Sequence, residues 1–371
     1  MKNTFDRREF LRTSATFGAM AAIGGLLPAK AVRAASIDVP VIDKLSIQVL
    51  VDSSFDLFLR PHQVNGVSVT SSKLAGGYRR SLHNEWGLSL WLESQLAGEQ
   101  RTLMLDYGYT PEVLANNMEL IGVDPGKLNA LIVSHGHYDH FGGLMGFLDR
   151  YRDKLPADVK LYSGGEDNFC HRVAKSGTPG QFTDFGTLDR RALDAKKITT
   201  VLAESPVIMA GQAFTTGRIK RSSLEKVLPN TMVEFGMKDG VGCDSGKYLA
   251  ADMAGKILPD EHIHEHATCF NLKDKGLVVI SSCGHVGIVN SVRQAQEVSG
   301  IEKVHAIVGG FHLGPAPKDY LEQVVGEIRK LKPDVLIPMH CSGLNFVQEA
   351  RLQMPQNLLL CTTGSRITFG A

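Results

Sequence analysis

The chain has 371 residues, with 40 Lys and Arg against 39 Asp and Glu, which gives a formal net charge of +1. This balance, with no basic run beyond the N-terminal segment, excludes the electrostatic pattern of a nucleic-acid-binding protein and gives no support to binding at a membrane surface. The length allows either one large domain with insertions or two domains.

The first 34 residues have the pattern of an export signal. A cluster of Lys and Arg precedes an apolar stretch over residues 15–27, which is short and rich in Gly and Ala. Residues 6–12 resemble the twin-arginine signal, which bacterial export machinery recognises. We predict a signal peptide over residues 1–34, the twin-arginine export machinery as a partner, a periplasmic or otherwise exported mature chain, and no stable membrane anchor after cleavage. An ordinary secretory signal and an uncleaved anchor helix are the alternatives, and both also place the chain outside the cytoplasm.

The six cysteines are scattered, without a CxxC pair or a compact framework. They lie at positions 170, 243, 269, 283, 341 and 361. This spacing does not indicate a disulfide scaffold. If the chain is exported already folded, its thiols are set in a reducing compartment, which leaves room for free or metal-bound cysteines.

Alternating apolar residues predict strands in the first part of the mature chain, and one helix interrupts them. The predicted strands cover residues 45–51, 86–93, 101–105 and 128–133. Pro111 opens the helix, which carries Leu114 and Met118 on one face. The last of these strands runs directly into Ser134 and a cluster of histidines, so we expect a metal site at its end.

Helices and strands alternate again towards the C-terminus, after a stretch without clear periodicity. Residues 142–153 predict a helix and residues 159–162 a strand, whereas residues 165–260 predict an insertion or lid of undefined topology. The later pattern predicts a hairpin over 267–272 and 277–282, helices over 287–298 and 318–331, and strands over 304–308 and 335–338. Together these elements indicate a mixed α/β fold in which helices cover sheets.

Four potential metal ligands stand within six residues, namely His135, His137, Asp139 and His140. Neutral imidazole and carboxylate groups both bind zinc, iron and similar ions. In an extended loop His135 and His137 share one face, while the following Asp139 and His140 can turn towards a second position. One loop could therefore serve two adjacent metal ions. The alternative is a polar loop with incidental histidines.

The segment from Ser134 to Gly143 resembles the H-x-H-x-D-H signature of the metallo-β-lactamase superfamily. The resemblance implies a four-layer αββα sandwich over residues 35–371, with residues 165–260 as an insertion or lid between the metal motifs. It implies that the first two histidines of the motif bind one metal ion, and that the Asp-His pair binds the second. Asp106 matches the Asp that buttresses the metal loop in that superfamily.

A closer resemblance is to the branch that includes dihydropterin-ribofuranosylaminobenzene phosphate synthase. It rests on blocks at residues 85–93, 106–143, 277–290, 309–313 and 338–343. By this match His285 completes the protein ligands of the first metal ion, and His340 completes those of the second. Both also follow predicted apolar strands, which independently favours a site position. His312 is a candidate for binding substrate or supporting the ligands, and a purely structural role is equally open.

Two positions depart from the superfamily pattern. The bridging aspartate of many superfamily hydrolases has no obvious counterpart, and Cys283 stands approximately in its place. A thiolate binds zinc or iron, although a small buried cysteine is the commoner case. Trp86 stands where the branch often has His, so a substrate contact shared with the branch is not implied.

A second histidine-rich stretch lies at residues 262–266, where three histidines alternate around Glu265. On a strand the histidines would share one face. Such a face could form a cluster that binds a ligand or transfers protons, or it could lie at a solvated edge of the sheet. We expect the solvated edge. Glu265 matches a family position and, with Asp106 and Cys283, is kept as a candidate for binding metal or supporting the ligands.

Two adjacent metal ions can hold and activate a water molecule, which leads to a hydrolase. We expect an exported metalloenzyme in which a metal-bound hydroxide attacks an ester, phosphoester or lactone-like centre of a small molecule. Asp139 would orient the nucleophile while binding metal, and His312 would steady the developing oxyanion. The expected cofactors are two divalent ions, zinc before manganese or iron, and no residue is assigned to an organic cofactor.

Three other functions stay open at this point. The branch resemblance supports a pterin-related synthase or transferase, although export argues against it because folate-type substrates are chiefly cytoplasmic. Superfamily members with iron in this kind of loop support a redox protein. The last alternative is a periplasmic protein that binds a metal or a ligand without catalysis.

Overall fold

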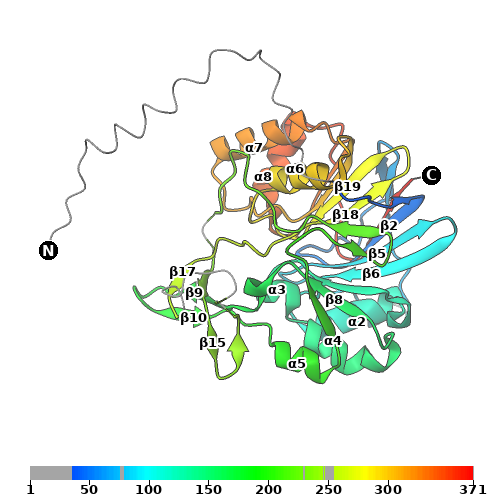
Figure 1. The fold of residues 1–371 in the computed structure, drawn as a ribbon. Helices are drawn as coiled ribbons and strands as arrows, with labels where there is room; N and C mark the ends of the chain where they lie inside the picture. The colour runs from blue at the N-terminus through cyan, green and yellow to red at the C-terminus, as the bar shows by residue number, and fades with distance from the viewer. Residues whose placement is uncertain (1–35, 76–78, 229, 245, 247–254, 371) are drawn as a thin grey trace, which may run out of the picture. The chain divides into compact units, whose positions relative to one another are not determined.

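The structure, a computed structural model, describes residues 36–75, 79–228, 230–244, 246 and 255–370 (Figure 1). The predicted signal peptide over residues 1–34 lies outside the described residues. Within the described ranges, no helix is long and apolar enough to cross a membrane.

The larger of two central sheets has nine strands. Their order is β11 (Thr199–Leu202), β8 (Lys160–Ser163), β7 (Ala130–Val133), β6 (Glu99–Leu105), β5 (Ser89–Leu96), β2 (Lys44–Val51), β22 (Ser365–Phe369), β4 (Val67–Ser71) and β3 (His62–Val64). Strands β6, β7, β8 and β11 are parallel, and the other pairings are antiparallel. The carboxyl ends of β6 and β7 therefore meet at one edge, which brings the residues after them together.

The second central sheet has seven strands. Six follow the order β12 (Ile208–Met209), β13 (Ala213–Thr215), β18 (Thr268–Leu272), β19 (Gly276–Ser281), β20 (Val304–Gly309) and β21 (Val335–Pro338), and β1 (Val41–Ile42) pairs with β18. Strands β18 and β19 form the predicted antiparallel hairpin, whereas β19, β20 and β21 are parallel. The segments that carry Cys283, His312 and His340 leave the carboxyl ends of these parallel strands.

Helices cover the outer faces of the two sheets, as Figure 1 shows. The first group is α2 (Pro111–Ile121), α3 (Tyr138–Phe141), α4 (Leu144–Tyr151) and α5 (Arg190–Ala195), and the second is α6 (Ile288–Ser299), α7 (Lys318–Lys330) and α8 (Leu344–Gln353). One apolar core lies between the two sheets. A second lies between the nine-stranded sheet and its helices, and a third between the seven-stranded sheet and its helices. Neighbouring residues of β7 show the alternation, because Leu131 packs towards the helices and Ile132 towards the other sheet. The predicted mixed α/β sandwich with αββα layers is confirmed.

Helix α2 begins and ends at residues that the sequence indicates. The Thr110 side chain caps the first turn by accepting the Val113 N–H at 3.4 Å, and Pro111 occupies the start of the helix. Gly122 ends the helix with a φ of 82°, a left-handed conformation that glycine adopts without strain. Leu114 and Met118 are buried against the nine-stranded sheet. The helix therefore fixes the chain between Asp106 and the histidine loop.

Residues 165–260 divide between the main sheets and a smaller one. Strands β11, β12 and β13 return to the two central sheets. The four-stranded sheet consists of β10 (Phe182–Asp184), β9 (His171–Lys175), β14 (Met232–Glu234) and β17 (Ile257–Pro259), and a hairpin joins β15 (Met237–Lys238) to β16 (Val241–Gly242). Thr231, directly before β14, contacts the histidine loop, so this small sheet lies against the candidate site.

Candidate metal centre

A single buried carboxylate holds the histidine loop from behind. Asp106, which follows β6, accepts hydrogen bonds from the Ser134 backbone N–H at 2.8 Å and the Ser134 hydroxyl at 2.7 Å. Its Oδ2 also lies 2.7 Å from Nδ1 of His140. Because the Nδ1–H of His140 donates to Asp106, the other ring nitrogen is left with a free lone pair. Asp106 thus fixes both the loop and the orientation of one candidate ligand.

The ring nitrogens that face away from such supports lack protein partners. Buried atoms without a hydrogen-bond partner in the described part of the chain include Nε2 of His135, His140, His285 and His340, and Oδ1 of Asp139. Each unpaired buried polar atom costs about 1–3 kcal/mol, so a group of them in one place calls for a bound partner. Imidazole and carboxylate donors suit divalent transition metals, and the group therefore fits metal ions.

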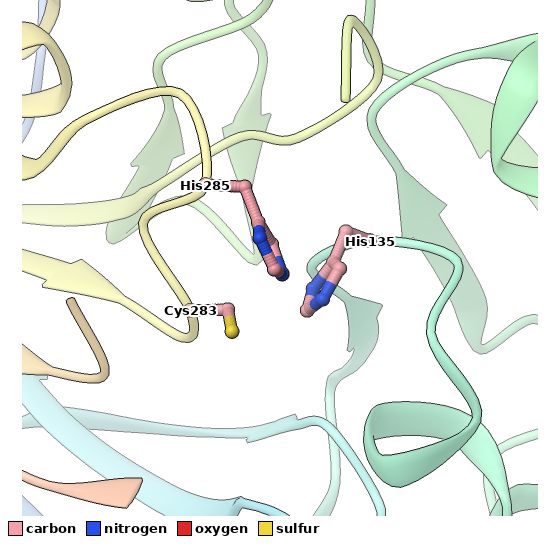
Figure 2. Close-up of side chains that lie close together, drawn as sticks. All are labelled: His135, Cys283 and His285. Carbon is pink, nitrogen blue, oxygen red and sulfur yellow. The ribbon is translucent and has the colours of Figure 1, made fainter. Parts of the chain in front are cut away.

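Cys283 lies between two groups of candidate ligands. His135, Cys283 and His285 offer ligand atoms within 4.8 Å of one another, and Figure 2 shows their side chains converging from two loops, one that carries His135 and one that carries both Cys283 and His285. A second group within the same limit joins His140, Cys283 and His340. The thiol is therefore shared by both groups, at the position where the sequence offers no bridging aspartate.

Asp139 lies beside the two histidines of the second group. Oδ2 of Asp139 lies 3.6 Å from Nε2 of His140 and 3.3 Å from Nε2 of His340. His340 follows β21, and Asp52 accepts its backbone N–H at 2.7 Å while the Ser53 hydroxyl lies 3.1 Å from its Nδ1. The structure thus brings Asp139, His140 and His340 together from two sheets.

His137 lies beside His135, with 4.8 Å between ring centroids, but it belongs to a different group of candidate ligands. Its Nε2 is 2.7 Å from Oγ1 of Thr231, and its ligand atoms group with those of His262 and His285 instead. The small sheet therefore reaches this histidine through a hydroxyl group. The ring of Phe185 also packs edge-on against His137, with 5.4 Å between centroids.

Two other segments position His285. Its Nδ1 lies 3.0 Å from Nδ2 of Asn230. Glu265 accepts the backbone N–H groups of His285 and Val286 at 3.1 and 2.8 Å. Both carboxylate oxygens of Glu265 are thus bound to the loop, and Glu265 is absent from the candidate metal groups among the described residues. Its contacts support the loop that carries His285.

His312 and Cys341 adjoin Cys283. The Cys283 Sγ lies 3.7 Å from Nδ1 of His312 and 3.0 Å from Sγ of Cys341. The His312 backbone N–H donates to Sγ of Cys341 at 3.2 Å. The His312 side chain is half-buried, and its Nε2 is without a partner in the described ranges. His312 therefore combines a free nitrogen with partial access to solvent.

The expected solvated edge at residues 262–266 is wrong. The three histidines are 0, 1 and 2 % exposed in chain order. Residues 262–265 form a turn rather than a strand, in which the Glu265 N–H donates to the His262 carbonyl oxygen at 3.0 Å. Beside them Arg172 and Asp260 form a buried ion pair at 2.8 Å. Polar partners from distant segments therefore allow these histidines to be buried, which local alternation cannot reveal.

Burial keeps the central imidazoles neutral. Desolvation, reinforced by neighbouring histidines, lowers the pKa of His135 and His285 well below the ordinary histidine value. Desolvation likewise lowers the pKa of His262 to about 3. For Asp139 burial alone would raise the pKa, but the adjacent His140 and His340 rings outweigh it and lower the pKa. Neutral imidazole and ionised carboxylate are the forms that bind metals.

Two features outside the ligand groups were not indicated by the sequence. Cys170 and Cys243 form a disulfide across 73 residues, and the other four cysteines are free and buried. Trp86 is 56 % exposed and lies beside the centre, with 4.8 Å between its ring centroid and that of His340. The rim of the site therefore presents an indole ring.

Residues 90–169, which include the histidine loop, match the family described as the metallo-beta-lactamase superfamily. The match to the family model is confined to these residues, and the fold of the chain is that of metallo-β-lactamase proteins. Members of this superfamily typically bind divalent metals, which agrees with the histidine and cysteine groups of the site.

Several known proteins are similar to this chain. The chain is 28% identical over 274 residues to 7,8-dihydropterin-6-methyl-4-(β-D-ribofuranosyl)-aminobenzene-5′-phosphate synthase of Methanocaldococcus jannaschii, covering 72% of this chain and 84% of that protein. It is 24% identical over 245 residues to an uncharacterised protein of the same organism, covering 66% and 80%. A solved structure described as a metal-dependent hydrolase of the β-lactamase superfamily matches with a TM-score of 0.60 at 21% identity, covering 87% and 98%. The likeness to that structure shows the fold.

Proposed function

We propose that the chain is an exported hydrolase that uses two divalent metal ions to cleave an ester, phosphoester or lactone-like bond in a small molecule. The observation that carries the proposal is the group of buried, unpartnered donor atoms around Cys283. When bound there, divalent ions supply Lewis-acid polarisation of the substrate and a nucleophile at neutral pH. Zinc is the first choice, and manganese and iron are the alternatives.

The side chains suggest two ion positions. In this proposal the first is held by His135, His137 and His285, and the second by Asp139, His140 and His340. Cys283 stands in both groups of candidate ligands and so offers a sulfur ligand between the two positions, which would lose its proton on binding metal. The contact between His137 and Thr231 is compatible with this assignment, because a hydroxyl group can turn its hydrogen elsewhere.

Two residues would act on the reacting groups. Asp139 has an ionised carboxylate with one unpartnered oxygen, which can accept a hydrogen bond from the attacking nucleophile and orient it. His312 has a free Nε2 at a partly open position, from which it can donate a hydrogen bond to an oxyanion. Asp106 supports both functions indirectly by holding the loop.

Export belongs to this proposal because of the basic cluster and apolar stretch in residues 1–34. Export of an already folded chain would deliver the metal centre intact to an oxidising compartment. Recovery of the processed protein from the periplasm of its host tests this part.

The proposal is tested by metal analysis and by assays against a panel of esters, phosphoesters and lactones. We expect two ions per wild-type chain and turnover of at least one substrate class. The double variant His135→Ala/His140→Ala should bind fewer than two ions per chain. Its kcat should fall by at least about 10²–10³-fold, the usual effect of removing a strong electrostatic contributor. Circular dichroism checks that the variant folds. The matched control is His305→Gln, which changes a buried histidine outside the site. Wild-type turnover by the folded double variant would sink the proposal.

A pterin-related synthase or transferase is the second candidate. The specific observation in its favour is the 28% identity to the Methanocaldococcus synthase over 84% of that protein. Adding a dihydropterin and a ribosylated aromatic amine phosphate to the assay panel separates the two reactions. Joining of these two substrates, with no hydrolysis in the panel, would favour the synthase, whereas two tightly bound irons would point to redox chemistry.

A further inference from the structure

The three histidines of residues 262–266 differ in how their ring nitrogens are used. His264 places Nδ1 2.9 Å from Asp167 Oδ2, and its Nε2 accepts the Gly136 backbone N–H at 2.9 Å. His266 places Nε2 3.1 Å from the Val133 carbonyl oxygen. These two histidines thus hold the segment against the metal loop.

His262 has no such role. It is 0 % exposed, and both of its ring nitrogens are without a hydrogen-bond partner in the described part of the chain. Its Nδ1 lies 3.9 Å from Oδ1 of Asp260, which is too far for a hydrogen bond. Since an unpaired buried polar group costs about 1–3 kcal/mol, a phenylalanine would fill this place at lower cost if packing were its only role.

The ring of His262 lies directly on the candidate centre. It stacks on His285 with 3.9 Å between centroids and 7° between planes, and its centroid is 4.8 Å from that of His137. The ligand atoms of His137, His262 and His285 all lie within 4.8 Å of one another. This geometry gathers three imidazoles from three separate segments around one point.

The backbone holds His262 in this place under strain. Its φ is 49°, a left-handed conformation that is uncommon for a residue other than glycine. Its backbone N–H donates to Oδ1 of Asp260 at 3.0 Å, and Asp260 is paired with the fully buried Arg172. Such strain persists where the surroundings over-determine a conformation, which is common at ligand sites.

We propose that His262 is a direct metal ligand, which with His137 and His285 forms an all-nitrogen pocket for a borderline transition-metal cation such as Zn²⁺, Co²⁺ or Fe²⁺. The inference rests on the proposed metal centre and adds a ligand that the H-x-H-x-D-H motif does not contain. The ion in this pocket has more imidazole donors than the ion beside Asp139 and His340. It is therefore the last to leave when a chelator removes metal from the protein.

The test compares full-length wild-type protein with His262→Gln and His262→Asp, using Zn²⁺ and Co²⁺ as the probes. Metal content is measured as a chelator is titrated, and the visible absorption of the Co²⁺-loaded protein reports the ligand field. We expect His262→Gln to weaken the tighter ion at least about 100-fold, the upper end of the effect of losing a ligand's supporting partner. His262→Asp, which supplies an oxygen ligand, should recover part of the affinity with an altered spectrum.

The matched control is His305→Gln. His305 is also buried and also has an unpartnered Nε2, but it belongs to none of the metal groups found among the described residues. It should retain both ions and the wild-type Co²⁺ spectrum. X-ray absorption of wild-type protein loaded with one Zn²⁺ counts imidazole ligands directly, and so decides the matter if neither His262 variant folds.

The outcomes separate this inference from the proposed function. Two ions in wild-type protein, with unchanged affinity and spectrum in His262→Gln, would overturn the role of His262 and leave the hydrolase proposal standing. Fewer than four imidazoles around the single Zn²⁺ would also overturn it, because His135, His137 and His285 already account for three. A wild-type chain that binds no Zn²⁺ or Co²⁺ would remove both proposals together.

Discussion

Two histidine-rich stretches, residues 135–140 and 262–266, look alike in sequence and differ in the structure. In the first, one carboxylate, Asp106, holds the loop from behind, while the outer nitrogens of His135 and His140 are left without partners in the described ranges. In the second, His264 uses both ring nitrogens on protein partners, and His266 uses Nε2, while its unpartnered Nδ1 belongs to none of the candidate metal groups of the described residues. The comparison teaches that the number of histidines does not identify ligands, whereas an unpartnered nitrogen that lies close to other donor atoms does.

The supports of the two stretches also differ in kind. The first relies on hydrogen bonds to a single carboxylate. The second rests on a fully buried ion pair, in which Arg172 Nε donates to Asp260 Oδ2 at 2.8 Å and the guanidinium group also donates to the carbonyl oxygens of residues 167, 168 and 170. Loss of support should therefore reduce metal binding in the first stretch and fold stability in the second.

The largest expected effect comes from Asp260→Asn. The substitution leaves the buried Arg172 without its counter-charge, and we expect the free energy of unfolding to fall by about 3 kcal/mol, the lower end of the range for breaking a buried pair. Chemical denaturation measures the change. The matched control is Asp189→Asn at the exposed pair with Arg191, where the loss should be about 0–1 kcal/mol. Equal losses in the two variants would contradict a structural role for the buried pair.

The next effect is on metal binding and comes from Asp106→Asn. An amide has one acceptor oxygen, so it cannot accept the Ser134 backbone N–H at one position and the His140 Nδ1–H at the other as the carboxylate does, and the loop and His140 are no longer held together. We expect metal affinity to fall about 10–100-fold, as measured by competition with a chelator. Asp124→Asn, at an exposed turn before the metal strand, should keep the wild-type affinity. If both variants bind metal equally well, Asp106 does not position a ligand.

The first stretch could be predicted because its information is local. Its candidate ligands are contiguous, they follow an apolar strand, and parallel strands bring the end of β6 beside the end of β7. The same holds for α2, whose cap, proline and terminal glycine stand at its ends. The positions of His285 and His340 after strands of the second sheet were also predictable, since each follows an apolar run.

The second stretch could not be predicted because its environment is assembled from distant segments. The bond between Gly136 and His264 spans 128 residues, and that between His264 and Asp167 spans 97. Residues 165–260 have no clear periodicity, so neither the small sheet nor the disulfide between Cys170 and Cys243 could be placed. Alternation suggested a strand edge, but a turn of a few residues gives the same spacing of polar side chains.

The smallest expected effect tests the distinction within the second stretch. His266→Gln removes the hydrogen bond to the Val133 carbonyl oxygen, and we expect the free energy of unfolding to fall by about 1 kcal/mol. Metal content and chelator resistance should stay at the wild-type level, because His266 has a protein partner and lies outside the candidate metal groups of the described residues. His83→Gln, at an exposed position, should change stability by less than about 0.5 kcal/mol. A loss of metal from His266→Gln comparable with that from His262→Gln would show that the two histidines share one role, and the contrast based on their ring nitrogens would fail.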